Sequence, residues 1–202
     1  MTNLEIEVKF YLKDISDMRQ KITHIGGVHE KSDNERNFRF EDSDRGLLKN
    51  EALLRLRITQ DQNVLTYKEK VRDPETDCKT YNEFEVTVSD FDRMAAILER
   101  IGYKPVQCYE KRRETYRIDN VVMCLDTMPF GNFIEIEGDP SAIKKTAEKL
   151  GFEWKNRILT NYLALFERLK LEFELDFNDV TFDNFKNTPI DFEKCHHLFV
   201  QA

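Results

Sequence analysis

Charged and apolar residues alternate strictly along several short stretches of this chain, the first of them at its amino-terminal end. In LEIEVKFYL, the charged residues Glu5, Glu7 and Lys9 occupy every second position, and apolar residues fill the positions between them. Alternation with a period of two is typical of a β-strand that has one apolar and one polar face. The pattern therefore predicts a strand at residues 4–12, and it raises the question of what the charged face contacts.

Similar alternation recurs along the chain. It predicts further strands at residues 35–41, 52–59, 63–71, 80–88, 108–118, 121–127 and 132–138. Helical periodicity lies between them, and it predicts helices at residues 15–25, 91–101, after Asp139-Pro140-Ser141 up to Gly151, and at 160–171. Helices of this kind have an apolar stripe that can cover the apolar face of a sheet. We therefore expect an α+β fold.

The charged strand faces admit two arrangements. A single amphipathic strand usually exposes its charges to solvent. Eight antiparallel strands can instead close into a barrel, which has no free edges and whose inner positions alternate with its outer ones. A lumen lined with charges is very costly unless opposite charges pair or a charged ligand binds.

The charged positions carry both signs. The carboxylates are Glu5, Glu7, Glu83, Glu85, Asp126, Glu135 and Glu137, and the cations are Lys9, Arg55, Arg57, Lys68, Lys111 and Arg113. Clustered carboxylates bind hard divalent cations such as Mg²⁺ or Mn²⁺. Clustered arginine and lysine bind phosphate oxygens. A site that contains both sets suits a complex of a metal ion with a polyphosphate.

Composition narrows the possible partners. The chain has 202 residues and a net charge of −7, which argues against nucleic-acid binding through overall positive charge. No apolar stretch is long enough to span a bilayer, and the first residues contain no basic-then-apolar run typical of a signal peptide. The scattered cysteines suit reduced thiols, so we expect a cytoplasmic protein with one main domain. They are Cys78, Cys108, Cys124 and Cys195.

Several motifs of the chain resemble those of a known protein family. Glu5-x-Glu7-x-Lys9 resembles the E-x-E-x-K signature of the CYTH superfamily, the triphosphate tunnel metalloenzymes. The resemblance continues in chain order through NEALLRLR, LTYKEK, NEFEV, YEKRRETY, CLDTMPFGNFIEIEG and LTNYLALFERL. It covers about residues 1–171 and implies an eight-stranded antiparallel β-barrel, or tunnel, with a charged interior and flanking helices.

The resemblance also implies roles for particular residues. It implies a Mg²⁺ or Mn²⁺ site formed by Glu5, Glu7, Asp126, Glu135 and Glu137. It implies that the triphosphate is bound by Lys9, Arg55, Arg57, Lys68, Lys111 and Arg113. Catalytic roles fall to Glu83, Glu85 and Lys9. For Tyr162, core packing is the expected role, and a hydroxyl contact with the site is the less expected alternative.

Three activities stay open. The family includes triphosphatases, whose substrate here would be tripolyphosphate, thiamine triphosphate or ATP, and class IV adenylyl cyclases, which form cyclic AMP and pyrophosphate. This chain departs from the cyclase-like members at Gly46, Glu69 and Tyr81, and the last of these stands where arginine is common. We therefore expect triphosphate hydrolysis. An adenylyl cyclase is the first alternative, and a non-catalytic module that binds polyphosphate or nucleotides is the second.

Residues 172–202 lie outside the resemblance. This extension is acidic and contains the phenylalanines Phe173, Phe177, Phe182, Phe185 and Phe192. Free phenylalanines in that number would form an exposed apolar patch. We therefore expect the extension to pack on the main domain or on a second subunit, in which case the protein would be a homodimer.

Overall fold

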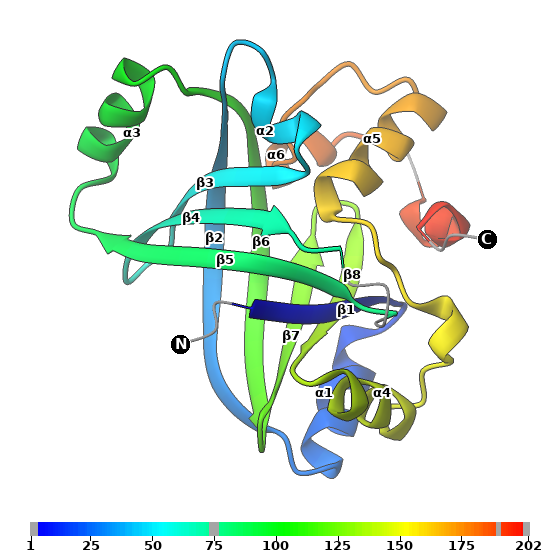
Figure 1. The fold of residues 1–202 in the computed structure, drawn as a ribbon. Coiled ribbons are helices and arrows are strands. Elements are labelled where there is room, and N and C mark those ends of the chain that lie inside the picture. The colour runs from blue at the N-terminus through cyan, green and yellow to red at the C-terminus, as the bar shows by residue number, and fades with distance from the viewer. Residues whose placement is uncertain (1–3, 73–76, 189–190, 200–202) are drawn as a thin grey trace.

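Eight antiparallel strands close into a barrel at the centre of the computed structural model, which describes residues 4–72, 77–188 and 191–199 (Figure 1). The strands are β1 (Leu4–Leu12), β2 (Val28–Glu41), β3 (Ala52–Ile58), β4 (Asn63–Lys70), β5 (Lys79–Val88), β6 (Lys104–Ile118), β7 (Val121–Met128) and β8 (Gly131–Glu137). Around the barrel they follow the order β1-β5-β4-β3-β2-β6-β7-β8, and β8 pairs with β1 to close the ring. The predicted α+β fold with an eight-stranded tunnel is confirmed.

Strand β2 differs from its prediction. It begins at Val28 rather than at residue 35, and its partner β6 begins at Lys104 rather than at residue 108. Residues 28–34 are almost all polar, so no apolar alternation marks them as a strand. They are ordered by pairing with β6, where Asp33 lies opposite Arg113.

The four predicted helices are present as α1 (Ile15–His24), α3 (Phe91–Arg100), α4 (Pro140–Lys149) and α5 (Tyr162–Glu172). Asp14 and Asp90 cap α1 and α3 by accepting hydrogen bonds from backbone N–H groups of the first turn. The short helices α2 (Gly46–Lys49), α6 (Phe182–Phe185), η1 (Trp154–Asn156) and η2 (Phe192–Leu198) were not predicted. Within the described residues, no helix is both long and apolar enough to cross a membrane.

The apolar faces of the strands point outward, and helices cover most of them, although Phe84 and Val86 of β5 are about half exposed. Val8 of β1 and Ile136 of β8 are fully buried in one cluster with Ile22 of α1 and Ile143 of α4, and both helices lie at the lower end of the barrel in Figure 1. A second cluster joins β2, β3 and β5 to α3. Because the apolar faces point outward, the alternating charged positions point into the barrel. The charges of the first strand therefore line an interior.

The described part of the extension packs beside α5 and β6. Val180 forms a parallel bridge with Tyr109 of β6, and Phe185 is buried in the cluster that contains Phe166 of α5. Phe173 and Phe177 pack against the same cluster, and the guanidinium of Arg112 lies over the ring of Phe182. The side chain of Phe192 lies outside the described residues.

Candidate active site

The inner faces of the strands line one cavity of about 1500 Å³. The sequence-predicted residues that line it are Glu5, Glu7, Lys9, Arg55, Arg57, Lys68, Glu83, Glu85, Lys111, Arg113, Glu135 and Glu137. Asp126 is the exception, because it is completely buried and lies behind the cations that face the cavity. The structure thus brings the predicted residues together from strands that are far apart in the sequence.

Lys9 lies at the centre of one wall and is only 1% exposed. Its ammonium contacts the carboxylate of Glu135 and lies 4.0 Å from the ring centre of Tyr162. The Tyr162 hydroxyl donates a hydrogen bond of 2.9 Å to Asp126. Tyr162 therefore packs in the core, as predicted, and also makes the hydroxyl contact that the sequence favoured less.

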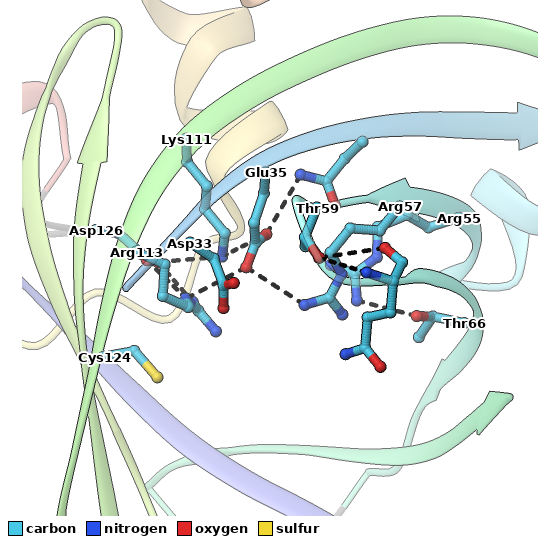
Figure 2. A network of polar contacts seen from close by, with 12 residues as sticks. Asp33, Glu35, Arg55, Arg57, Thr59, Thr66, Lys111, Arg113, Cys124 and Asp126 are labelled. Atoms are coloured by element: carbon cyan, nitrogen blue, oxygen red, sulfur yellow. Dashed lines mark hydrogen bonds and ion pairs between the residues drawn. The ribbon is translucent and has the colours of Figure 1, made fainter. Parts of the chain in front are cut away.

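A buried network of ion pairs joins β2, β6 and β7 (Figure 2). The guanidinium of Arg113 donates to both carboxylate oxygens of Asp126, at 2.7 and 2.6 Å, and also contacts Glu135. The ammonium of Lys111 lies 3.3 Å from Asp126 and 3.6 Å from Glu35. Fork-shaped contacts of this kind are also the way in which guanidinium groups bind phosphate.

The two arginines of β3 form a second group, also visible in Figure 2. Arg57 lies 2.9 Å from Glu85 and 3.4 Å from Glu35, and Arg55 donates hydrogen bonds to the hydroxyls of Tyr109 and Thr66. The Nε atoms of both arginines are buried and have no hydrogen-bond partner within the described part of the chain. Buried donors are nearly always paired in native proteins. These guanidinium groups thus retain donor capacity that an anion in the cavity can satisfy.

Three carboxylates converge where β1 meets β8. One ligand oxygen from each of Glu5, Glu7 and Glu137 lies within 4.8 Å of the other two. The ammonium of Lys68 lies 2.5 Å from Glu5, and that of Lys79 lies 2.9 Å from Glu7. Such oxygen donors suit the chemistry of Mg²⁺ or Mn²⁺, which also keeps coordination positions for phosphate oxygens.

The other two residues of the predicted metal set do not join this carboxylate cluster. Asp126 and Glu135 instead pair with cations, namely Arg113 and Lys111 for Asp126, and Lys9 and Arg113 for Glu135. In the structure they hold the phosphate-binding candidates in place.

Two cavity carboxylates have pKa values close to or above neutral. Burial, together with the neighbouring carboxylate of Glu5, raises the pKa of Glu137 to about 8. Burial raises the pKa of Glu83 to about 7, although Lys68 lies 3.1 Å away and opposes that shift. These two carboxyl groups can therefore exchange protons near neutral pH.

Other carboxylates of the cavity ionise readily because cations surround them. Burial alone would raise the pKa of Glu7, but Lys79, Lys9 and Lys68 together outweigh it and hold the pKa below its usual value. Burial is likewise outweighed at Glu135, where Lys9 and Arg113 hold the pKa well below its usual range. The cavity thus combines ionised and protonated carboxyl groups within one set of strands.

Sequence reasoning missed two buried members of the site. Lys79 is one residue before the predicted start of its strand, yet it continues the alternation of Tyr81 and Glu83 and could have been found by extending that strand. Glu35 is the first residue of a predicted strand, and the alternation of Phe38 and Phe40 places it on the opposite, polar face, so extending the charged set to this strand could have found it. Lys79 and Glu35 are thus charged residues of the barrel interior.

The fold and the lumen define a class of protein: a closed antiparallel β-tunnel with a charged interior and helices outside it. The family model described as the CYTH domain matches residues 3–161, and the chain belongs to this family.

Comparisons with individual proteins agree with this assignment. A Methanocaldococcus jannaschii protein provisionally named an adenylate cyclase is 25% identical over 171 residues, which cover 83% of this chain and 90% of that protein. A solved structure from Pyrococcus horikoshii has a TM-score of 0.68 and 26% identity, and the match covers 82% of this chain and 99% of that one. A protein from Hippeastrum shares the fold, with a TM-score of 0.59 and 19% identity. The match covers 81% of this chain and 95% of that one. That protein is provisionally named an adenylyl cyclase and is described as having a dominant triphosphatase activity.

Proposed function

We propose that this protein is a Mg²⁺- or Mn²⁺-dependent enzyme that hydrolyses a triphosphate inside its tunnel. The observation that carries the proposal is the convergence of six phosphate-binding candidates on one cavity that also contains a three-carboxylate cluster. Membership of the CYTH family and the names of its relatives support an enzyme acting on a triphosphate. The substrate candidates are tripolyphosphate, thiamine triphosphate and ATP.

Binding is proposed to be an exchange of partners. Each of the six cations already faces a carboxylate or a hydroxyl in the tunnel, for example Arg57 with Glu85 and Lys68 with Glu5. Buried cations are costly when unpaired, so these carboxylates keep the tunnel stable until the ligand enters. A triphosphate would replace them as the partner of Arg57 and Lys68. The carboxylates that it releases would then need a new positive partner.

The cluster of Glu5, Glu7 and Glu137 is proposed to hold the metal ion. A bound Mg²⁺ or Mn²⁺ supplies positive charge to the phosphate oxygens and lowers the pKa of a coordinated group. Within the protein, Lys9 and Arg113 would orient the triphosphate and stabilise developing negative charge. Glu83 would accept the proton of the attacking water, because its pKa of about 7 suits a base at neutral pH. Glu85 would keep Arg57 in position.

The test is to incubate the protein with tripolyphosphate, thiamine triphosphate and ATP, each with Mg²⁺, with Mn²⁺ and with a chelator. We expect metal-dependent release of phosphate from at least one of them. Absence of turnover with all three compounds and both metals would refute the proposal.

Adenylyl cyclase activity is the second candidate, and the name of the Methanocaldococcus relative favours it. The same tunnel could place a ribose 3′-hydroxyl, rather than water, in line with the α-phosphorus of ATP. Chromatography of the ATP reaction distinguishes the two chemistries. Cyclic AMP with pyrophosphate indicates cyclisation, whereas ADP with phosphate indicates hydrolysis. Stabilisation of the fold by an unchanged triphosphate after long incubation would instead indicate a binding module.

A further inference from the structure

Arg39 and Arg45 line the same cavity but take no part in its ion pairs. The other cavity-lining lysines and arginines pair with a carboxylate, except Arg168, which donates to the carbonyl of Leu198 at 3.0 Å. Neither the Arg39 nor the Arg45 guanidinium has a hydrogen bond or an ion pair to any residue that the structure describes. Two adjacent cations without an anion are unusual in a cavity where charges otherwise pair.

The position of Arg39 extends the row of cations on β3. Arg39 lies on the inner face of β2, directly opposite Arg55 of β3 and Gln107 of β6. Its Nε atom is buried and has no hydrogen-bond partner within the described ranges. Arg45 repels Arg39 through space, and an anion bound between these two guanidinium groups would offset that repulsion.

The acid closest to Arg39 along its own strand is already engaged elsewhere. The carboxylate of Glu41 accepts hydrogen bonds from the backbone N–H groups of Leu47 and Leu48, both at 3.0 Å. These bonds hold the β2–α2 turn in which Arg45 adopts a left-handed backbone with a φ of 57°. Glu41 thus fixes the turn instead of neutralising Arg39.

The charges that act on Arg39 through space come from several elements. They are Glu41 of β2, Arg45 of the β2–α2 turn, Glu167 of α5 and the phenol of Tyr109 on β6. Burial lowers the pKa of Arg39, and Arg45 lowers it further. The two acids Glu41 and Glu167 lie beyond ion-pair distance of it, so their attraction does not replace a bound anion.

We infer that Arg39 and Arg45 form a second anion subsite, which binds one further phosphate group on a ligand whose triphosphate is held by Arg55, Arg57 and the other tunnel cations. This inference rests on the proposed function. The planar guanidinium fork matches phosphate oxygens, and two such groups suit a doubly charged phosphate. The phosphate has two possible sources: the fourth unit of a linear polyphosphate, or a phosphate ester on the organic group of the triphosphate.

The experiment compares matched ligands that differ by this one phosphate. One pair is tripolyphosphate and linear tetrapolyphosphate. The other pair is a nucleoside 5′-triphosphate and the same compound with a 3′-phosphate. KM and kcat are measured for the wild type, the double variant Arg39→Gln/Arg45→Gln and the control Arg36→Gln. Arg36 lies on β2 but points outward, with its side chain 57% exposed and 3.8 Å from Glu110.

We expect the wild type to bind the longer member of at least one pair about tenfold more tightly, as a lower KM and a larger rise in Tm. The double variant should lose this difference, and Arg36→Gln should keep it. The pair that shows the difference identifies the source of the phosphate. A wild type that treats both members of both pairs alike, or a double variant that keeps the preference, overturns the inference.

The two proposals fail in different ways. Hydrolysis of tripolyphosphate without any preference for the extra phosphate overturns only the second subsite. Absence of hydrolysis for every ligand overturns the proposed function, and the Tm shifts then still report whether the additional phosphate is bound. A double variant whose ligand-free Tm matches that of Arg36→Gln shows that the lost preference does not come from a damaged fold.

Discussion

The ammonium of Lys79 lies 2.9 Å from Oε1 of Glu7, and the two side chains, on the neighbouring strands β5 and β1, are only 5% and 9% exposed. Glu7 also belongs to the carboxylate cluster with Glu5 and Glu137. One lysine therefore supplies the positive charge at one side of this cluster, and Lys68 supplies it at the other through Glu5. These two lysines offset part of the negative charge that the three carboxylates bring together.

Lys79→Gln should make the fold more dependent on metal. Removing one partner of a buried ion pair costs about 3 kcal/mol, so the metal-free variant should have a lower free energy of unfolding. A divalent cation would then replace the missing charge. Mg²⁺ or Mn²⁺ should therefore raise the Tm of the variant more than that of the wild type, as measured by thermal denaturation.

Lys21→Gln is the matched control for this variant. Lys21 pairs with Asp17 at 2.8 Å, but both side chains are about half exposed, and pairs of this kind contribute about 1 kcal/mol or less. Its metal response should equal that of the wild type. An equal metal response in Lys79→Gln as well would show that Lys79 does not compensate the cluster.

Glu83 should make the metal-free protein less stable as the pH rises toward neutrality. Its pKa is about 7 in the folded protein, above the ordinary value of 4.5. Between these two pH values the folded state therefore binds more protons than the unfolded state, so the free energy of unfolding falls as the pH increases. Glu83→Gln should flatten this decline in urea denaturation between pH 4.5 and 7. The same slope in variant and wild type would contradict the account.

Glu35 has the opposite effect on the pH dependence of stability, because it makes the protein less stable as the pH falls, and this effect occurs at lower pH. Its pKa lies below the ordinary value of 4.5, because Lys111 and Arg113 outweigh the effect of burial. Its contribution to stability is therefore present above pH 4.5 and is lost as the pH falls below that value. Glu35→Gln should remove this acid-dependent loss. Acid denaturation from pH 5 downward, compared with that of the wild type, measures the difference.

Tyr162→Phe should separate the hydroxyl of Tyr162 from its ring. The variant loses the 2.9 Å hydrogen bond to Asp126, and such bonds to charged groups contribute about 1.5 kcal/mol. It keeps the ring that lies 4.0 Å from Lys9. Tyr162→Leu loses both contacts and should be less stable than Tyr162→Phe by urea denaturation. Equal stability of the two variants would mean that the ring under Lys9 contributes nothing.

Much of the barrel could be predicted because its strands alternate so strictly. β1 has the same bounds in prediction and structure, since every second residue from Leu4 to Leu12 is apolar. The start of β2 could not be predicted, because its polar residues are ordered by pairing with β6 and not by a local pattern. Long-range pairing of this kind leaves no periodic signal in a single sequence.

Most residues of the candidate site could be predicted from the sequence, but their contacts with one another could not. Alternation indicates that Glu135 and Glu137 share a face, but it cannot show that Glu135 pairs with Lys9 while Glu137 meets Glu5 and Glu7. Those contacts depend on how strands distant in sequence align around the ring. For the same reason, nothing in the sequence shows that Glu41 is engaged by backbone amides and leaves Arg39 without a partner.

The most direct test of the central claim is phosphate release from tripolyphosphate by the wild type and by Glu7→Gln, with saturating Mg²⁺ or Mn²⁺. The amide oxygen of the variant can still accept a hydrogen bond from Lys79, and the loss of one charge relieves repulsion with Glu5 and Glu137. Its Tm should therefore fall less than that of Lys79→Gln, while its turnover falls about 100-fold because a metal ligand is lost.

Glu30→Gln serves as the control, because Glu30 pairs with Arg117 at 2.5 Å on the outside of the protein. It should retain wild-type turnover. The account predicts metal-dependent phosphate release by the wild type and by Glu30→Gln, and its near absence in Glu7→Gln. Turnover of Glu7→Gln close to that of the wild type at saturating metal would contradict the claim that the first strand lines a metal-dependent triphosphate site.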